Sequence, residues 1–403
     1  MLPEVAFNPM VEMSRLVVSV KAREGRRARA GAPWLFSNEI AMTTALKGLP
    51  AGTVVNVVGD DGRSFGTGTF NAASLIAVRL YASACDVGLD RAFFAMRLQR
   101  ALTLRQQLYA EPYYRLVHAE GDGLPGLVVD RFGDACVVQI TTAGMEALRQ
   151  PFLAALDDVV GPATVILRAD APARALEGLP SYMAVEKGDG GRLGVEENGV
   201  RYFADSAGGQ KTGWYYDQRD NRAFLASLAR GRSVLDAYCY TGGFALAAAM
   251  AGAREVAGLD SSAPALALAE DAARANALSA NFIRADVFEE LERLSSAHET
   301  FDVVAADPPP FVKSKKDLET GAKAYRKLAR LAASVTAPGG VLMLASCSHN
   351  IPLERFAQEC AMGLQRAGRA ARLIRQAGAG PDHPVHPMLP ETAYLKALFY
   401  ALD

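Results

Sequence analysis

Four aspartates and one cysteine stand where the sequence predicts that strands end. Strand-like apolar runs lead into Asp236, Asp260, Asp286 and Asp307, and the run 341–345 leads into Ser346-Cys347-Ser348-His349-Asn350. In an open α/β sheet, ligands bind at the carboxyl ends of the strands. These positions therefore predict one polar crevice, in which Cys347 is a candidate nucleophile because Ser and His flank it at a strand exit.

Residues 233–260 predict a nucleotide-type β-α-β unit. After Asp236 come a turn, an Ala-rich helix at 244–250 and a strand that ends before Asp260, and the turn contains Tyr240, Thr241, Gly242 and Gly243. The third glycine of Gly-x-Gly-x-x-Gly is missing, which disfavours a dinucleotide. S-adenosylmethionine has a ribose and an ammonium but no phosphate, so it fits better, with Asp236 facing the ammonium and Asp260 the ribose. A purely structural turn is the alternative.

A segment dense in glycine, aromatic and acidic residues, 208–219, precedes a predicted helix at 219–228. Trp214 and Tyr215 stand beside a polar cluster in this segment, an arrangement that suits the wall of an adenine pocket. The alternative is an interdomain hinge in which Asp217 or Asp220 caps the helix.

Length and composition limit the possible classes of protein. With 403 residues, the chain is expected to form two or three domains. The net charge of -1 means that any surface for a polyanion must be local. Five cysteines without metal-ligand spacing, and no signal peptide, predict free thiols, no metal site and a cytoplasmic location. No apolar run reaches the roughly 18 residues of a membrane span, and a homodimer is an open possibility.

The local basic surface is predicted near the N-terminus. Basic and aromatic residues gather between positions 15 and 36, and the candidate RNA contacts among them are Lys21, Arg23, Arg26, Arg27, Arg29 and Trp34. Strand-like runs at 53–58, 66–70 and 75–81 indicate a small β-rich domain around this segment. Such an edge suits contact with an RNA backbone and stacking on bases. A solvated charged face with a core Trp is the alternative.

The middle of the chain predicts an α+β domain. A long helix at 89–109 is followed by strands at 127–131 and 135–141, a helix at 145–160 and a strand at 164–168. Asn198-Gly199 predicts a hairpin turn, which completes a β-β-α-β-β unit. The predicted domains are therefore residues 1–82, 83–205 and 206–403.

Six motifs in this order resemble one known family: Lys211-Thr212-Gly213, Asp217-Gln218-Arg219, Tyr240-Thr241-Gly242-Gly243-Phe244, Asp307-Pro308-Pro309, Ser346-Cys347-Ser348 and Asp382-His383-Pro384. The chain is similar to the large-subunit ribosomal RNA cytosine-C5 methyltransferases. The resemblance implies a PUA-like RNA-binding domain, an α+β middle domain and a Rossmann-like class I methyltransferase domain with a mostly parallel seven-stranded sheet. It implies S-adenosylmethionine as cofactor and large-subunit ribosomal RNA as partner.

The resemblance also implies roles for individual residues. Cys347 would attack C6 of cytosine as a thiolate so that C5 can take a methyl group, and Asp307 would bind the base at N3 or N4. The candidate cofactor contacts are Lys211, Thr212, Asp217, Gln218, Arg219, Asp236, Tyr240, Thr241, Gly242, Gly243, Asp260, Asp286 and Asp307.

The sequence departs from the family pattern after Asp307. Pro310 stands where a lysine is expected, and no second cysteine lies near the Asp-Pro-Pro motif. The group that removes the C5 proton therefore stays open between His349, His383 and a water molecule.

Three other functions remain as alternatives. The Asp-Pro-Pro motif also suits an amino-group methyltransferase that acts on adenine or guanine, although Phe311 stands one residue too late for its aromatic position. A non-catalytic RNA-binding factor that retains the cofactor fold belongs to a different class. A nicotinamide dehydrogenase is the third, and the missing glycine counts against it.

Overall fold

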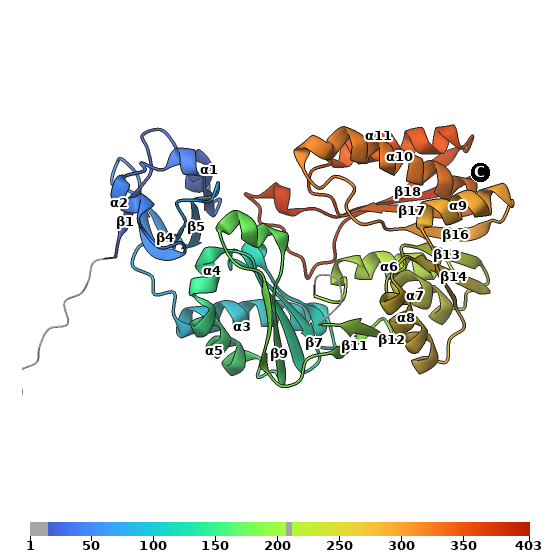
Figure 1. Ribbon diagram of the computed structural model, residues 1–403, viewed down its shortest axis with the longest axis horizontal. Coiled ribbons are helices and arrows are strands. Elements are labelled where there is room, and N and C mark those ends of the chain that lie inside the picture. The colour runs from blue at the N-terminus through green and yellow to red at the C-terminus, as the bar shows by residue number, and fades with distance from the viewer. Residues whose placement is uncertain (1–14, 207–211) are drawn as a thin grey trace, which may run out of the picture.

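The computed structural model describes residues 15–206 and 212–403, which form successive β-rich and α/β parts (Figure 1). The N-terminal part is a five-stranded sheet in the order β1-β3-β4-β5-β2. Its elements are β1 (Val17–Ser19), α1 (Arg26–Arg29), β2 (Trp34–Leu35), α2 (Thr44–Lys47), β3 (Thr53–Val58), β4 (Ser64–Phe70) and β5 (Val78–Ala82). Apolar side chains such as Val18, Val55 and Val78 fill its interior, which confirms the expected small β-rich domain.

The middle part is a five-stranded sheet in the order β10-β9-β8-β7-β6, with helices packed against it. Its elements are α3 (Arg91–Leu108), β6 (Tyr113–His118), β7 (Leu127–Phe132), β8 (Ala135–Ile140), α4 (Ala143–Ala147), α5 (Arg149–Val159), β9 (Thr164–Ala169) and β10 (Tyr182–Lys187). The predicted β-β-α-β-β unit was wrong in two respects. It lacked the edge strands β6 and β10, whose charged residues hide the apolar alternation, and it placed the later hairpin in this sheet.

That hairpin is a separate two-stranded sheet, made of β11 (Arg192–Glu197) and β12 (Val200–Asp205). Asn198 and Gly199 both have positive φ angles, of 52° and 80°, as the predicted two-residue turn requires. Val195 and Tyr202 of the hairpin share one apolar cluster with Val137 of the middle sheet and with helices of the third part. The hairpin therefore joins the two parts, and the predicted boundary at residue 205 remains a prediction.

The third part is a seven-stranded sheet in the order β15-β14-β13-β16-β17-β19-β18. Its strands are β13 (Ser233–Ala237), β14 (Glu255–Asp260), β15 (Asn281–Arg284), β16 (Phe301–Ala306), β17 (Thr336–Ser346), β18 (Ala371–Ala377) and β19 (Lys396–Leu402). The first five strands in this order are parallel, and β19 is antiparallel to both β17 and β18. The expected mostly parallel seven-stranded sheet is thereby confirmed.

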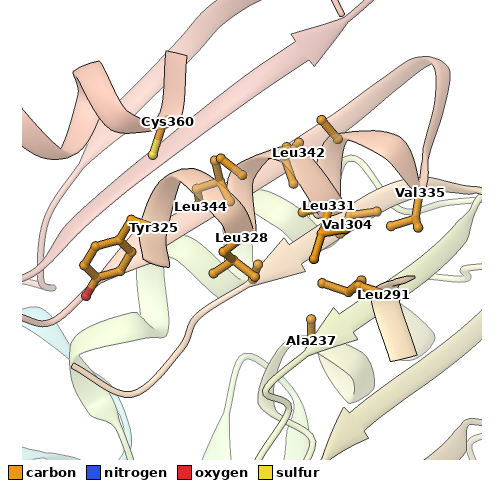
Figure 2. Close-up of a cluster of buried hydrophobic side chains, with 14 of the residues drawn as sticks. Ala237, Leu291, Val304, Tyr325, Leu328, Leu331, Val335, Leu342, Leu344 and Cys360 are labelled. Carbon is orange, nitrogen blue, oxygen red and sulfur yellow. The ribbon is translucent and has the colours of Figure 1, made fainter. Parts of the chain in front are cut away.

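Helices cover both faces of this sheet (Figure 1). They are α6 (Arg219–Ser227), α7 (Gly243–Met250) and α8 (Ala263–Ala275) on one face, and α9 (Val287–Ser296), α10 (Leu318–Ser334) and α11 (Leu353–Arg366) on the other. Val304, Leu342 and Leu344 of the sheet pack against Leu328 and Leu331 of α10 (Figure 2). Two-sided burial explains why these strands read as continuous apolar runs in the sequence.

The strand order reverses at β13, whose neighbours β14 and β16 continue the chain in opposite directions across the sheet. The crevice beyond the carboxyl ends of strands at such a point is where α/β sheets bind ligands. A long segment between β18 and β19 runs from the sheet back towards the N-terminal part (Figure 1). No helix among the described residues is long and apolar enough to cross a membrane.

Candidate active site

A pocket opens at the carboxyl ends of β13, β14, β16 and β17. It is lined by Trp214, Tyr215, Asp217, Gln218, Arg222, Tyr238, Cys239, Tyr240, Thr241, Gly243, Phe244, Asp260, Ser261, Asp307, Pro308, Pro309, Pro310, Cys347 and Leu395. The structure thus brings Asp260, Asp307 and Cys347 to one cavity, although Asp260 and Cys347 lie 347 − 260 = 87 positions apart in the chain.

The turn after β13 has an unusual backbone. Tyr238, Tyr240 and Gly242 have φ angles of 67°, 49° and 81°, in the left-handed region that non-glycine residues rarely adopt. A Cβ atom at position 242 would also lie 3.1 Å from Ala269 and from Phe282. The two tyrosines carry local strain, which persists only where the surrounding fold imposes it and is frequent at ligand sites.

Asp260 holds this turn in place. One carboxylate oxygen accepts a hydrogen bond from the backbone N–H of Tyr240 at 2.9 Å, and the other accepts from Ser262 N–H at 2.8 Å. Each oxygen keeps a further lone pair. Because Asp260 also lines the pocket, these lone pairs can accept hydrogen bonds from the hydroxyl groups of a ligand.

Asp236 lies buried behind the pocket. Its Oδ2 accepts a hydrogen bond from Ala245 N–H at 2.8 Å. Its Oδ1, like the hydroxyl of Thr241, has no hydrogen-bond partner among the described residues. Burial raises the pKa of Asp236 to about 7, and the nearby charges of Asp307 and Asp260 add to the increase. A cationic ligand group would give Oδ1 a hydrogen-bond partner and would reduce the repulsion between the three carboxylates.

Two further acids of the pocket are fixed by side chains from distant segments. Gln218 donates to Oδ2 of Asp307 at 2.9 Å, and the Tyr394 hydroxyl donates to Oδ2 of Asp217 at 2.6 Å. The oxygens of the pocket are therefore positioned by hydrogen bonds before any ligand binds, as electrostatic binding sites require.

Cys347 faces the pocket because its two neighbours face the other way. The Ser346 hydroxyl donates to the Tyr325 hydroxyl at 2.8 Å, and Tyr325 also pairs with the Ser348 hydroxyl at 2.8 Å. Both serines are buried, whereas Cys347 is half-buried and lines the pocket. Successive side chains alternate at a strand end, so the two serine contacts direct the intervening thiol towards the ligand side.

Lys396 lies beside the strand exit that carries Cys347. Lys396 Nζ donates to the Ser348 carbonyl at 2.7 Å. Burial lowers the pKa of Lys396, and attraction to an ionised Cys347 opposes that change. Burial raises the pKa of the thiols of Cys136, Cys239 and Cys360, so they stay protonated.

Some predicted contacts lie outside the lining of the pocket. The Thr212 hydroxyl donates to Asp130 of the middle part, and Arg219 pairs with Glu197 at 3.3 Å. Asp286 caps α9 by accepting from Glu289 N–H at 3.1 Å. Gly242 belongs to the turn after β13 but does not line the pocket. Lys211 lies outside the described residues, so its predicted contact stays a prediction.

The predicted RNA contacts are exposed or tied to other parts. Arg27 pairs with Glu391 at 2.7 Å, Arg29 lies 3.5 Å from Asp61, and Trp34 Nε1 donates to Glu120 at 2.9 Å. Lys21 donates to the Asn38 carbonyl at 2.7 Å. Arg23 and Arg26 are exposed and form no ion pair with the described residues. Trp34 is therefore an interdomain contact rather than a freely exposed ring.

Several residues of the pocket were not predicted. Tyr238, Arg222, Ser261 and Leu395 line it but carry no motif of their own. Arg222 is placed by a buried ion pair with Glu197 at 2.6 Å. Its position four residues after Gln218 on one helix face was the signal that could have identified it. Among the described residues, no group of three or more His, Cys, Asp or Glu could hold a metal ion.

Comparisons with known proteins identify the class. The family described as S-adenosylmethionine-dependent methyltransferase matches residues 180–400, and the PUA-like domain matches residues 18–83. The fold and the pocket thus define a methyltransferase that uses S-adenosylmethionine, with an N-terminal PUA-like domain, as the sequence predicted. This match excludes the nicotinamide dehydrogenase alternative.

Two curated relatives narrow the family. Ribosomal RNA large subunit methyltransferase I from Shewanella amazonensis is 36% identical and covers 94% of this chain and 98% of the relative. The same enzyme from Shewanella denitrificans is 36% identical, and the match covers 95% of this chain and 99% of the relative. The chain belongs to the family of these two methyltransferases. The solved structure of SMU.776, a methyltransferase complexed with SAH, matches with a TM-score of 0.82 at 22% identity. The match covers 96% of this chain and 100% of that structure, which supports the fold.

The residues that line the pocket, together with Asp236 buried behind it, fit the cofactor. The unpartnered Oδ1 of buried Asp236 suits an ammonium group, and Asp260 offers acceptors for ribose hydroxyls. Pro308 and Pro309 supply a rigid apolar wall for a planar base. These assignments of individual side chains are proposals that follow from the geometry.

Proposed function

We propose that the protein transfers a methyl group from S-adenosylmethionine to C5 of a cytosine in RNA. Large-subunit ribosomal RNA is the proposed substrate because the curated relatives are named for it. The observation that carries the proposal is the position of Cys347 in the same pocket as Asp260 and Asp307. The exposed basic residues of the PUA-like domain support an RNA partner, and the proposed location is the cytoplasm.

The chemistry requires a nucleophile because C5 of cytosine is itself weakly nucleophilic. The Cys347 thiolate adds to C6, and the electron pair of the C5–C6 double bond becomes available at C5. S-adenosylmethionine, when bound, supplies an electrophilic methyl group on its sulfonium. Asp307 hydrogen-bonds the base at N3 or N4 and favours the adduct. Loss of the C5 proton restores the double bond, and the electron pair of the C6–Sγ bond returns to sulfur.

The alternative amino-group methyltransferase is less well supported. Its mechanism needs an aromatic side chain of the Asp-Pro-Pro motif against the target base. Here Phe311 packs on Tyr325 and Phe288, with ring centroids 4.8 and 5.9 Å away. Pro308, Pro309 and Pro310 line the pocket instead. The packing of Phe311 thus favours the cysteine chemistry.

Replacing the proposed nucleophile tests this function. The Cys347→Ala variant should lose methyl transfer to ribosomal RNA from a deletion strain while it keeps its affinity for S-adenosylmethionine. Cys85→Ala is the matched control, because Cys85 lies in the N-terminal part and bonds Ser64. Mass spectrometry of the product nucleosides identifies the methylated atom. Full activity of Cys347→Ala, or a methylated amino group, would contradict the proposal.

A further inference from the structure

A second basic surface lies on the third part of the chain, beside the pocket. Residues 313–330 carry seven basic and two acidic side chains, a balance of 7 − 2 = +5 in a chain whose net charge is -1. Together with Arg366 of α11, the basic residues form what we call the α10 surface: Lys313, Lys315, Lys316, Lys323, Arg326, Lys327 and Arg330. The function proposed so far gives these residues no role.

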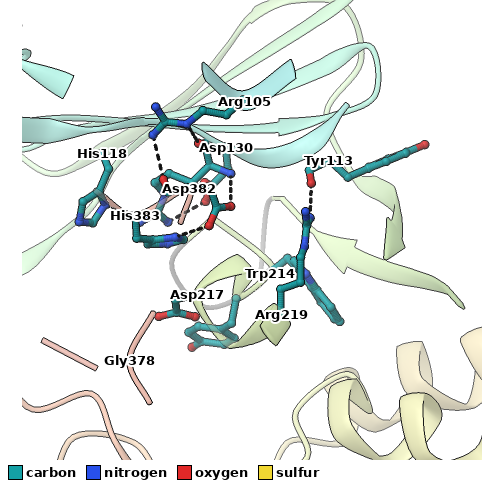
Figure 3. A network of polar contacts seen from close by, with 12 residues as sticks. Arg105, Tyr113, His118, Asp130, Trp214, Asp217, Arg219, Gly378, Asp382 and His383 are labelled. Carbon is teal, nitrogen blue, oxygen red and sulfur yellow. Dashed lines mark hydrogen bonds and ion pairs between the residues drawn. The ribbon is translucent and has the colours of Figure 1, made fainter. Parts of the chain in front are cut away.

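Charged side chains between the middle part and the pocket are, in contrast, paired within the chain. Figure 3 shows such a network, in which Arg105 donates to the Asp382 carbonyl at 2.8 Å and Arg219 donates to the Tyr113 carbonyl. Both guanidinium groups are buried. Groups of this kind hold the fold together and have no free surface to offer to a partner.

Most cations of the α10 surface are not paired in this way. Arg326 pairs with Glu359 at 2.6 Å, and Lys327 pairs with Glu292 at 3.0 Å. The other six form no ion pair with the described residues, and all of them except the half-buried Arg330 are exposed. Their charges are therefore available to a negatively charged partner.

Three of the lysines lie in a loop at the edge of the pocket, residues 313–316. Pro310, three residues before this loop, lines the pocket. Asn350 Nδ2 donates to the Lys313 carbonyl at 3.0 Å, and Asn350 follows Cys347 by three residues. The loop therefore lies beside the strand exit that carries the proposed nucleophile.

The backbone of this loop is fixed by hydrogen bonds. Asp317 Oδ2 accepts from the Ser314 N–H at 2.9 Å and from the Ser314 hydroxyl at 2.8 Å. Val312 N–H donates to the Ser348 hydroxyl at 3.3 Å. The lysine side chains are thus exposed on a backbone that keeps one position relative to the pocket.

The basic residues of α10 share one face of that helix. Lys323, Arg326, Lys327 and Arg330 follow the spacing i, i+3, i+4, i+7. With Arg366 they line a groove of about 390 Å³, and all five residues that line it are basic. Like charges at i, i+4 destabilise a helix, so this spacing does not serve folding. A negatively charged partner in the groove explains it.

The groove continues the loop away from the pocket. The chain leaves the carboxyl end of β16 at the pocket, forms the loop, and then runs back along the sheet as α10. From Lys323 to Arg330 the helix rises about 10 Å, at 1.5 Å for each of seven residues. An extended row of cations fits a polymer with repeated negative charges better than it fits one small anion.

We propose that the α10 surface binds the phosphate backbone of the RNA strand that carries the target cytosine. This inference rests on the proposed function. Loop 313–316 contacts phosphates next to the nucleotide in the pocket, and the groove contacts phosphates further along the strand. Such contacts fix the position of the strand without reading its sequence, so they bring the cytosine to Cys347 whichever bases flank it.

The test measures how RNA binding depends on salt. The double variants Lys315→Ala/Lys316→Ala and Lys323→Ala/Arg366→Ala remove two unpaired cations each, one pair from the loop and one from the groove. In filter binding of the full-length protein to protein-free large-subunit ribosomal RNA, each should reduce the slope of log affinity against log salt by about 1.4–1.8, which is 0.7–0.9 for each lost phosphate contact. The KM for RNA should rise, and affinity for S-adenosylmethionine should stay unchanged.

A matched control removes two cations from the opposite edge of the same sheet. Arg254 precedes β14, Arg274 lies near the end of α8, and they are 64% and 68% exposed. The variant Arg254→Ala/Arg274→Ala should keep the slope of the unchanged protein. An equal loss of slope in this control would mean that only total charge matters, which would overturn the inference.

Two further results would also overturn it. One is a normal slope in either of the α10-surface variants. The other is normal binding to protein-free RNA combined with loss of methylation on a ribosomal subunit precursor, which would indicate a protein partner for this surface. Activity of Cys347→Ala, or a methylated amino group in the product, would overturn the proposed function and would leave the measured phosphate contacts as they are.

Discussion

Charged groups at the pocket and in the N-terminal basic segment, residues 21–34, are held in different ways. Glu197 and Arg222 pair at 2.6 Å and are 1% and 3% exposed, whereas Arg27 and Glu391 pair at 2.7 Å and are 46% and 43% exposed. The distances are nearly equal, but the surroundings are not. Removing one partner of a buried pair leaves an uncompensated charge, while an exposed pair contributes about 0–1 kcal/mol.

These surroundings limit what each region can do. Buried, hydrogen-bonded groups keep one geometry, which a reaction requires. Exposed guanidinium groups can exchange a protein partner for a phosphate at little cost, which suits a sequence-independent RNA contact. The same residue types thus serve positioning in one region and attraction in the other.

The largest expected effect comes from breaking the buried pair at the pocket. Glu197→Gln leaves the guanidinium groups of Arg219 and Arg222 without their carboxylate. We expect the free energy of unfolding to fall by about 3–5 kcal/mol, as measured by urea denaturation. The neighbouring Glu196→Gln is the control, because Glu196 is 46% exposed and pairs with Arg201 at 3.3 Å. Equal effects of the two variants would contradict the comparison.

A smaller effect is expected from Asp236→Asn. The amide can still accept from Ala245 N–H but carries no charge, so we expect affinity for S-adenosylmethionine to fall about 10–100-fold, the equivalent of a charged hydrogen bond of about 1.5–3 kcal/mol. Calorimetric titration measures this loss. Asp271→Asn, on the exposed face of α8, is the control and should bind normally.

The same variant carries a pH test. Burial raises the pKa of Asp236 to about 7, above the ordinary value of 3.8. The folded state then holds its proton more tightly than the unfolded state, so this group's contribution to stability is complete below pH 3.8 and is lost as pH rises towards 7. Cofactor affinity should rise over the upper part of that range, because a cation favours the carboxylate. Asp236→Asn should remove both dependences, and their persistence would assign them to another group.

The sequence predicted the parts of the site that local pattern determines. Asp260, Asp307 and Cys347 follow apolar runs, and parallel strands bring their ends to one edge, so their meeting followed from periodicity. The position of Cys347 at a strand exit, flanked by Ser and His, also marked it as the candidate nucleophile. The strand β6 was missed because Arg115, which pairs with Asp130, interrupts its apolar run.

Long-range contacts were beyond sequence reasoning. His118 and His383 meet across 265 residues, since 383 - 118 = 265, and no local pattern encodes that approach. The hydrogen bond between the Trp34 indole and Glu120 of the middle part was likewise not predicted, and contact of Trp34 with RNA stays a prediction. The sequence gives the type of side chain at each position, but its contacts depend on how the domains pack.

The smallest expected effect is in the basic segment. Arg23 and Arg26 are exposed on the N-terminal part, so the double variant Arg23→Ala/Arg26→Ala should keep the fold and the cofactor affinity. Each lost phosphate contact should reduce the slope of log affinity against log salt by about 0.7–0.9. Filter binding to ribosomal RNA at several salt concentrations measures the slope. Arg63→Ala, 83% exposed in the same part but outside the segment, should leave the slope unchanged. A weaker affinity with an unchanged slope would mean that the two arginines affect the shape of the surface and do not contact phosphates. That result would contradict the contrast between exposed charges that attract RNA and buried charges that hold the pocket in one geometry.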